Sequence, residues 1–113
     1  MWPEVFMAME RHMNYLERRW DPETGLFRNT PGFNGPLNEF ATNIASSEAG
    51  NVIGYCRILL QSANSERIAE ESSSGITRDR IRALLVQATG LAELSESKTK
   101  ELAKAKHEAK YGS

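Results

Sequence analysis

The stretch from Trp20 to Pro36 constrains the fold more than any other part of the sequence. It contains three of the four prolines and three of the eight glycines, together with three aromatic residues. Proline lacks the backbone N–H that an α-helix needs and glycine weakens a helix, so this stretch interrupts helical structure. On both sides of it, apolar residues recur at three- and four-residue steps, which indicates amphipathic helices. The stretch therefore separates a short N-terminal helix from a longer helical remainder.

Residues 1–20 are predicted to form the N-terminal helix. Pro3 suits its first turn, where a missing N–H costs nothing, and Pro22 disfavours a helical backbone at Asp21. The apolar stripe of this helix consists of Val5, Phe6, Met9, Met13, Leu16 and Trp20. Residues 21–36 are expected to form a loop, because they are rich in turn-forming residues.

Residues 37–95 are predicted to form a long antiparallel helical hairpin. Its first helix begins near Leu37, and its second begins just after Thr77, which is a good N-cap residue. Between these two helices, residues 65–71 either continue the first or form a short helix of their own. Residues 96–113 are rich in Lys, Glu and Ala, so we expect a charged helical tail that is frayed or pairs with a partner.

The length of 113 residues is typical of one domain. We therefore expect a single all-α domain in which the short N-terminal helix packs across the hairpin. Apolar residues make up 40% of the chain, which gives a thin core. Small helical chains of this kind often complete their core by forming oligomers.

Small residues gather in the middle of the predicted second helix. Gly50 and Gly54 are four residues apart and so lie on one helix face. Each glycine costs a helix up to about 1 kcal/mol relative to alanine, a cost that is tolerated where another backbone comes close. We predict that a partner helix crosses closely near Ala49–Gly54. The alternative is a helix break at Gly50.

The residue types that carry catalysis or bind metals are scarce. His12 and His107 lie far apart and have no metal-ligand spacing, and no nucleophile or phosphate-binding motif occurs. Cys56 lies in an apolar stretch, where a reduced and buried thiol is expected, and this favours the cytoplasm. No run is long enough to span a membrane. We therefore expect no enzyme activity, no metal and no cofactor.

Two acidic residues lie between two aromatic residues in the segment W-D-P-E-T-G-L-F, which begins at Trp20. This segment resembles the connecting loops of helical-toroid glycosidases, and aromatic residues beside acids can line a sugar site. The resemblance covers eight residues, and a complete toroid does not fit in 113 residues. A turn that fixes the exit of the first helix explains the same residues.

Three closely spaced arginines, Arg78, Arg80 and Arg82, give an alternative interpretation as a DNA-binding regulator. The sequence around them is similar to a helix-turn-helix, whose second helix presents its first residues to the major groove. Neighbouring carboxylates would repel phosphate, and the net charge of the chain is −1. A solvated helix start explains the arginines better, so nucleic acid is an unlikely partner on this pattern.

The N-terminal helix carries more aromatic residues and methionines than a short helix needs for a monomer core. Methionine-rich faces adapt to partner surfaces, and Trp and Tyr are enriched at interfaces. The sequence thus predicts a non-catalytic, cytoplasmic helical module that self-associates or binds a protein partner in a regulatory role. A second alternative is a small-ligand-binding oligomer that uses Tyr15, Arg19, Trp20, Phe27 and Arg28. The predicted partner- or ligand-binding residues are Phe6, Met9, Met13, Tyr15, Arg19, Trp20, Phe27 and Arg28.

Overall fold

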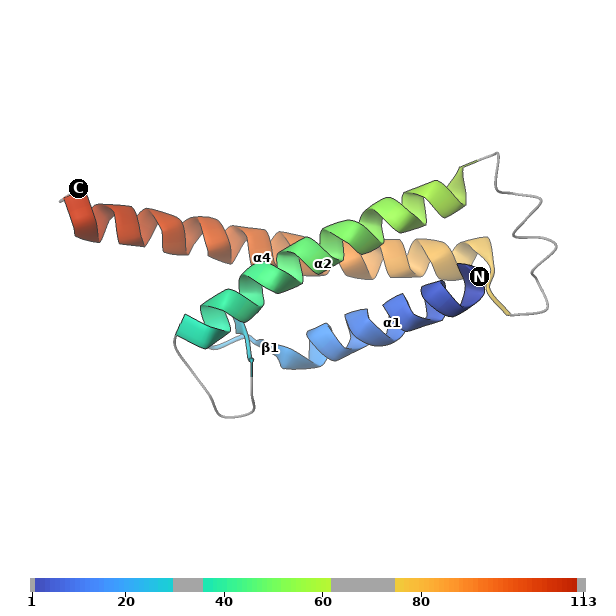
Figure 1. The fold of residues 1–113 in the computed structure, drawn as a ribbon, viewed down its shortest axis with the longest axis horizontal. Helices are drawn as coiled ribbons and strands as arrows, with labels where there is room; N and C mark the ends of the chain where they lie inside the picture. Colours follow the sequence, from blue (N-terminus) through green and yellow to red (C-terminus); the bar gives the residue numbers. More distant parts are fainter. Residues whose placement is uncertain (1, 30–35, 62–74, 112–113) are drawn as a thin grey trace.

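Three helices and one short strand pair make up the computed structural model, which describes residues 2–29, 36–61 and 75–111. In chain order the elements are α1 (Trp2–Arg19), β1 (Trp20–Asp21), β2 (Leu26–Phe27), α2 (Pro36–Leu60) and α4 (Arg78–Tyr111). Helices α2 and α4 run antiparallel along each other, and α1 lies beside them (Figure 1). The predicted all-α fold with a helical hairpin is therefore confirmed. Residues 65–71, for which the sequence left open a continuation of α2 or a short separate helix, lie outside the described residues.

The segment that follows α1 contains a small β-hairpin where the sequence predicted only a loop. Strands β1 and β2 pair antiparallel, with Trp20 opposite Phe27 and Asp21 opposite Leu26. The Gly25 N–H donates to the Asp21 carbonyl oxygen at 2.8 Å, and Gly25 has a φ of 72°, which favours glycine. Strands of two residues are too short to show an alternating pattern, so the sequence does not reveal them.

A buried hydroxyl fixes the hairpin to the start of α2. The Thr42 Oγ1 accepts a hydrogen bond from the Phe27 N–H at 2.8 Å and donates to the Asn38 carbonyl oxygen at 2.8 Å. The Asn38 Oδ1 accepts a hydrogen bond from the Asn29 N–H at 2.9 Å. These bonds place the end of β2 against the first turns of α2, and so fix where the chain leaves α1.

The core lies mainly between α2 and α4, and α1 and β2 cover one side of it. Small residues in both helices let their backbones approach each other. The buried apolar residues are Phe6, Met13, Leu16, Phe27, Ala45, Ala49, Val52, Cys56, Leu59, Ile76, Ile81, Leu84, Ala88, Leu91 and Ala92. Phe40 and Ile44, which the helical pattern would also place on the inner face of α2, lie outside this core and are exposed.

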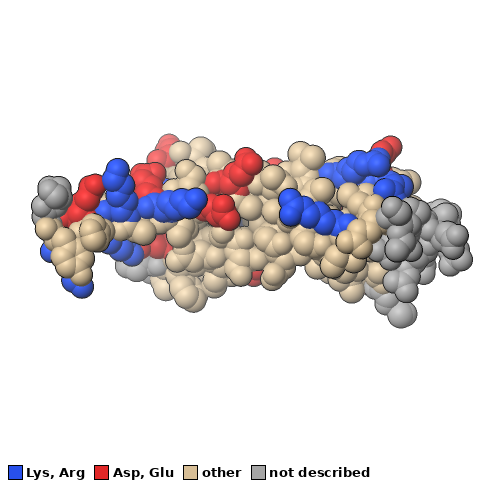
Figure 2. All heavy atoms as spheres, turned by 90° about the horizontal axis from the view of Figure 1, so that it is seen from above, with Lys and Arg blue, Asp and Glu red and all other residues tan. Residues whose placement is uncertain are grey.

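Helix α4 begins as predicted and extends through the charged tail. The Thr77 Oγ1 accepts a hydrogen bond from the Arg80 N–H at 3.2 Å, which is the N-cap bond. Lys106 forms an ion pair with Glu39 at 2.9 Å, and this contact ties the tail to α2. Positively and negatively charged side chains are interspersed with uncharged ones at the end of the molecule where the tail lies (Figure 2). None of the described helices is long and apolar enough to cross a membrane.

The small residues of α2 divide between two faces. Helix α2 runs without a break through Gly50, so the predicted alternative of a helix break is wrong. Ala49 is fully buried in the core. A Cβ atom added at Gly50 or Gly54 would meet nothing within 4 Å among the described residues. Ala49 thus lies in the core, whereas the two glycines do not meet another helix within the described chain.

Candidate functional site

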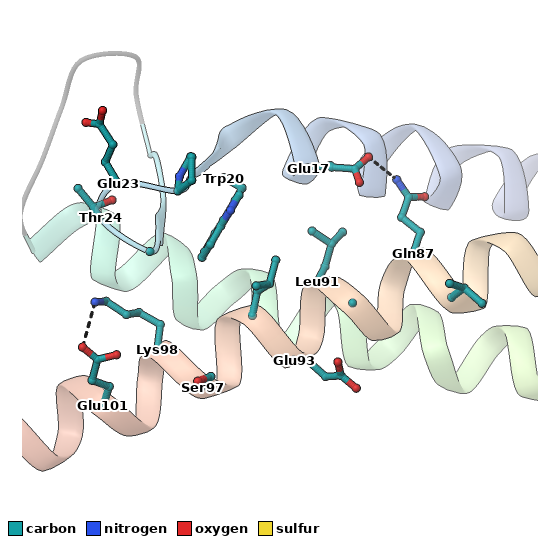
Figure 3. Close-up of a pocket in the computed structure, with 15 residues that line it drawn as sticks. Glu17, Trp20, Glu23, Thr24, Gln87, Leu91, Glu93, Ser97, Lys98 and Glu101 are labelled. Carbon is teal, nitrogen blue, oxygen red and sulfur yellow. Dashed lines mark hydrogen bonds and ion pairs between the residues drawn. The ribbon is translucent and has the colours of Figure 1, made fainter.

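A groove lies between the C-terminal end of α1, the β-hairpin turn and the middle of α4 (Figure 3). Its volume is about 830 Å³. Trp20 and the turn residues form one wall, and α4 forms the other. The residues of α4 that line it run from Val86 to Glu101, a distance of about 22 Å at about 1.5 Å per residue. A groove of this length is open enough to accept about four turns of a helix.

The wall on α4 presents apolar groups to solvent. Val86, Gly90 and Leu94 are four residues apart, so they form one line along the helix. Val86 is 72% exposed and Leu94 is 41% exposed. A Cβ atom at Gly90 would meet nothing within 4 Å among the described residues, so there is open space between Val86 and Leu94. We refer to Val86, Gly90 and Leu94 as the apolar floor of the groove, and this floor is uncovered.

The indole of Trp20 completes the apolar lining from the other wall. It is half-buried, and its ring lies 5.3 Å from the ring of Phe27, with an angle of 57° between the ring planes. Phe27 is buried and belongs to the β-hairpin partner strand. The strand pair thus holds Trp20 in one orientation at the groove edge. Of the predicted binding residues, Trp20 is thus one that lines the groove.

The charged side chains of the groove are mostly acidic. Four carboxylates line it, those of Glu17, Glu23, Glu93 and Glu101, against the single ammonium group of Lys98. The Lys98 Nζ lies 3.3 Å from the Glu101 Oε1, so that ammonium is already paired. The amide of Gln87 donates to a carboxylate oxygen of Glu17 at 3.1 Å (Figure 3). The groove therefore offers a negative rim around an apolar floor.

Four other predicted residues meet on the far side of α1, around a cavity of about 140 Å³. They are Tyr15, Arg19, Phe27 and Arg28. The Arg19 Nε donates to the Arg28 carbonyl oxygen at 2.5 Å, and its Nη2 donates to the Asn29 carbonyl oxygen. The guanidinium carbon of Arg19 also lies 5.1 Å from the centre of the Tyr15 ring. Arg19 thus ties the end of α1 to the strand β2 and the residues after it.

The remaining predicted residues of α1 lie toward the core. Phe6 and Met13 are fully buried, and Met9 is partly buried against the core. None of the three presents a large free surface to a partner. The apolar stripe of an amphipathic helix looks the same in sequence whether it meets its own chain or another, so the pattern did not separate these outcomes.

The three arginines of the DNA-binding alternative each contact the chain itself. Arg80 forms a two-bond ion pair with Glu10 of α1, with Nε to Oε2 at 2.8 Å and Nη2 to Oε1 at 2.5 Å. Hydrogen bonding to Glu10 raises the pKa of Arg80 above its already high value, against a smaller opposite effect of burial. Arg78 donates to the Leu60 carbonyl oxygen at 3.0 Å, and Arg82 pairs with Asp79 at 3.0 Å. Arg80 therefore joins α4 to α1, Arg78 joins the start of α4 to the end of α2, and Arg82 pairs within the first turn of α4.

The thiol and the imidazoles lie apart from one another. Cys56 is buried between the helices, and burial raises the pKa of its thiol to about 11, with a further contribution from the Glu10 carboxylate. His12 contacts the Glu48 carboxylate of α2, and His107 lies near Tyr111 in the tail. Among the described residues, no three His, Cys, Asp or Glu side chains gather as metal ligands would.

The sequence missed the α4 wall of the groove. The residue that could have revealed this wall is Val86, because it is apolar but lies off the buried stripe of α4, so core packing does not explain it. No family model matches the chain, and no curated protein or solved structure matches it significantly.

Proposed function

We propose that this chain is a non-catalytic helical module that self-associates or binds a protein partner, and that its partner site is the acidic groove. The observation that supports the groove as a partner site is its uncovered apolar floor, formed by Val86, Gly90 and Leu94, beneath a negative rim. Exposed apolar patches rimmed by polar groups mark interaction sites. We place the module in the cytoplasm, where the buried thiol of Cys56 stays reduced.

The shape and charge of the groove favour one kind of occupant, an amphipathic helix with basic residues along its edges. The end of α1 with the β-hairpin turn provides one wall and α4 provides the other, so a helix seated between them extends the bundle. Leucine-type side chains would cover Val86 and Leu94, and lysines or arginines would meet the four carboxylates. Because Gly90 has no side chain, the backbone of the added helix has room to approach the floor there.

A peptide of defined chemistry tests this site. The probe is a fluorescent amphipathic peptide of about four helical turns, with leucines on one face and lysines at its edges. We expect saturable binding that weakens as salt is raised, because the rim attracts the probe electrostatically. The same peptide with glutamates in place of lysines should bind at least about tenfold more weakly. Fluorescence anisotropy measures both.

Two substitutions locate the binding to the groove. Val86→Lys places a positive charge on the floor, where it repels the probe and removes apolar contact. The matched control, Ala83→Lys, adds the same charge to an exposed residue of α4 that does not line the groove. We expect about tenfold weaker binding for the first and little change for the second. Equal effects of the two substitutions, or no saturable binding by the native chain, would overturn the groove as the partner site.

A further inference from the structure

The face of α2 that points away from α4 is exposed and carries no charge over five turns. We define the outer stripe as six exposed residues of this face, which are Phe40, Ile44, Ser47, Asn51, Gly54 and Ile58. Phe40 is 61% exposed, Ile58 is 54% exposed and Ile44 is 41% exposed. Solvated helix faces ordinarily carry charged side chains, so three large apolar residues and a glycine are unusual there.

The spacing of the outer stripe is that of a helix that meets another helix. Its residues alternate steps of four and three, which is the repeat of a seam between two packed helices. Gly54 lies within this seam, where nothing within 4 Å occupies the space beside it among the described residues. A glycine in a helix interior costs up to about 1 kcal/mol relative to alanine, which a close partner backbone would offset.

The outer stripe is complementary to itself when a second α2 runs in the opposite direction. About an axis level with Ala49, Phe40 lies opposite Ile58 of the second copy, and Ile44 lies opposite Gly54 of that copy. Ser47 then lies opposite Asn51, so two hydrogen-bonding side chains face each other at the centre. Phe40 and Ile58 thus pack against each other, Ile44 meets the space beside Gly54, and the outer stripe holds no charge that the pairing would bury.

Charges at the edge of the outer stripe agree with the same arrangement. Glu39 and Arg57 are 18 residues apart, or about five turns, so they lie on the same side of α2. In an antiparallel pair of helices, residues on the same side face each other, so Glu39, which also pairs with Lys106 of its own chain, lies beside Arg57 of the second copy. Two such pairs form across the axis, and opposite charges select the antiparallel orientation.

We propose that the outer stripe is the interface of a homodimer, in which the α2 helices of two copies pack antiparallel about an axis level with Ala49. This inference rests on the self-association part of the proposed function and is independent of the groove. The outer stripe is about 27 Å long on a single helix, at about 1.5 Å per residue. An interface of that extent lies at the small end of specific contacts, so we expect dissociation in the micromolar range.

Charge substitutions at the two ends of the outer stripe test the register. Phe40→Glu and Ile58→Lys each bury an unpaired charge at the interface, so each variant alone should dimerise at least about tenfold more weakly. When the two variants are mixed in equal amounts, the introduced carboxylate of one copy meets the introduced ammonium group of the other, and the second contact remains native. We therefore expect the mixture to recover the dimer. Sedimentation equilibrium measures the mass against that of the 12.7 kDa monomer.

The controls separate this interface from the groove. Both substituted residues are exposed, and circular dichroism should show unchanged helix content in each variant. Val86→Lys, in the groove, should dimerise like the native chain. A native chain that stays monomeric at high micromolar concentration, or a mixture that does not recover, overturns the antiparallel interface. Loss of the dimer in Val86→Lys but not in Phe40→Glu would place the second copy in the groove instead.

Discussion

The thiol of Cys56 has an exposure of 0% in the contact between α2 and α4. Burial raises its pKa from 9.0 to about 11, because an apolar surrounding disfavours the thiolate, and the Glu10 carboxylate adds to this. An unfolded chain therefore loses the thiol proton at lower pH than the folded chain does. The stability that this difference contributes is fully present below pH 9 and is lost as the pH rises toward 11.

We expect the free energy of unfolding to fall between pH 8.5 and pH 10.5 by about 2 kcal/mol through this one group, from the shift in pKa. Guanidinium titrations of the native chain and of Cys56→Ala at both pH values measure it. The substitution leaves a small cavity that lowers stability at every pH, so the relevant quantity is the difference in pH dependence. Equal pH dependence in both proteins would show that the thiol is not held in its neutral form.

Among the elements, the helices could be predicted from sequence, whereas the strand pair and the groove could not. Helical periodicity extends over many residues, and the N-cap bond of Thr77 is local, so both are visible in one segment. The strands β1 and β2 have two residues each, and the position of β2 against α2 depends on Thr42, 15 residues after Phe27. The groove joins three separate segments, so Trp20, Val86 and Lys98 meet only after the fold brings them together.

Two glycines show how the element around a residue decides its effect on stability. Gly90 lies within α4 with open space at its missing Cβ, so Gly90→Ala should stabilise the chain by up to about 1 kcal/mol. Gly25 has a φ of 72° in the β-hairpin turn, and a Cβ there would lie 3.3 Å from the Lys98 side chain. Gly25→Ala should therefore destabilise the chain by about 1 kcal/mol or more. Opposite shifts in thermal unfolding test the pair, and shifts of equal sign would contradict it.

At the scale of the whole molecule, the chain is long and thin. Its radius of gyration is 16.9 Å, against about 13 Å for a compact domain of this length. An elongated shape leaves much of each helix uncovered, which is why both the groove and the outer stripe of α2 are open. It also makes the packing of α1 depend on few side chains, chiefly Phe6, Met13 and Leu16.

Neighbouring residues of α1 test whether that helix is part of one cooperative unit. Phe6 is fully buried, and the Arg80 guanidinium carbon lies 5.7 Å from the centre of its ring, whereas Val5 is 45% exposed. Phe6→Ala should lower the free energy of unfolding by about 3 kcal/mol, and Val5→Ala by about 0.5 kcal/mol or less. Guanidinium unfolding at low micromolar protein, followed by tryptophan fluorescence and by circular dichroism, measures both. Fluorescence and circular dichroism should give one coincident transition for each variant, because Trp2 and Trp20 report on α1 and its exit while circular dichroism reports on all three helices. An early fluorescence transition in Phe6→Ala, with most of the helix signal retained, would mean that α1 undocks independently of the hairpin.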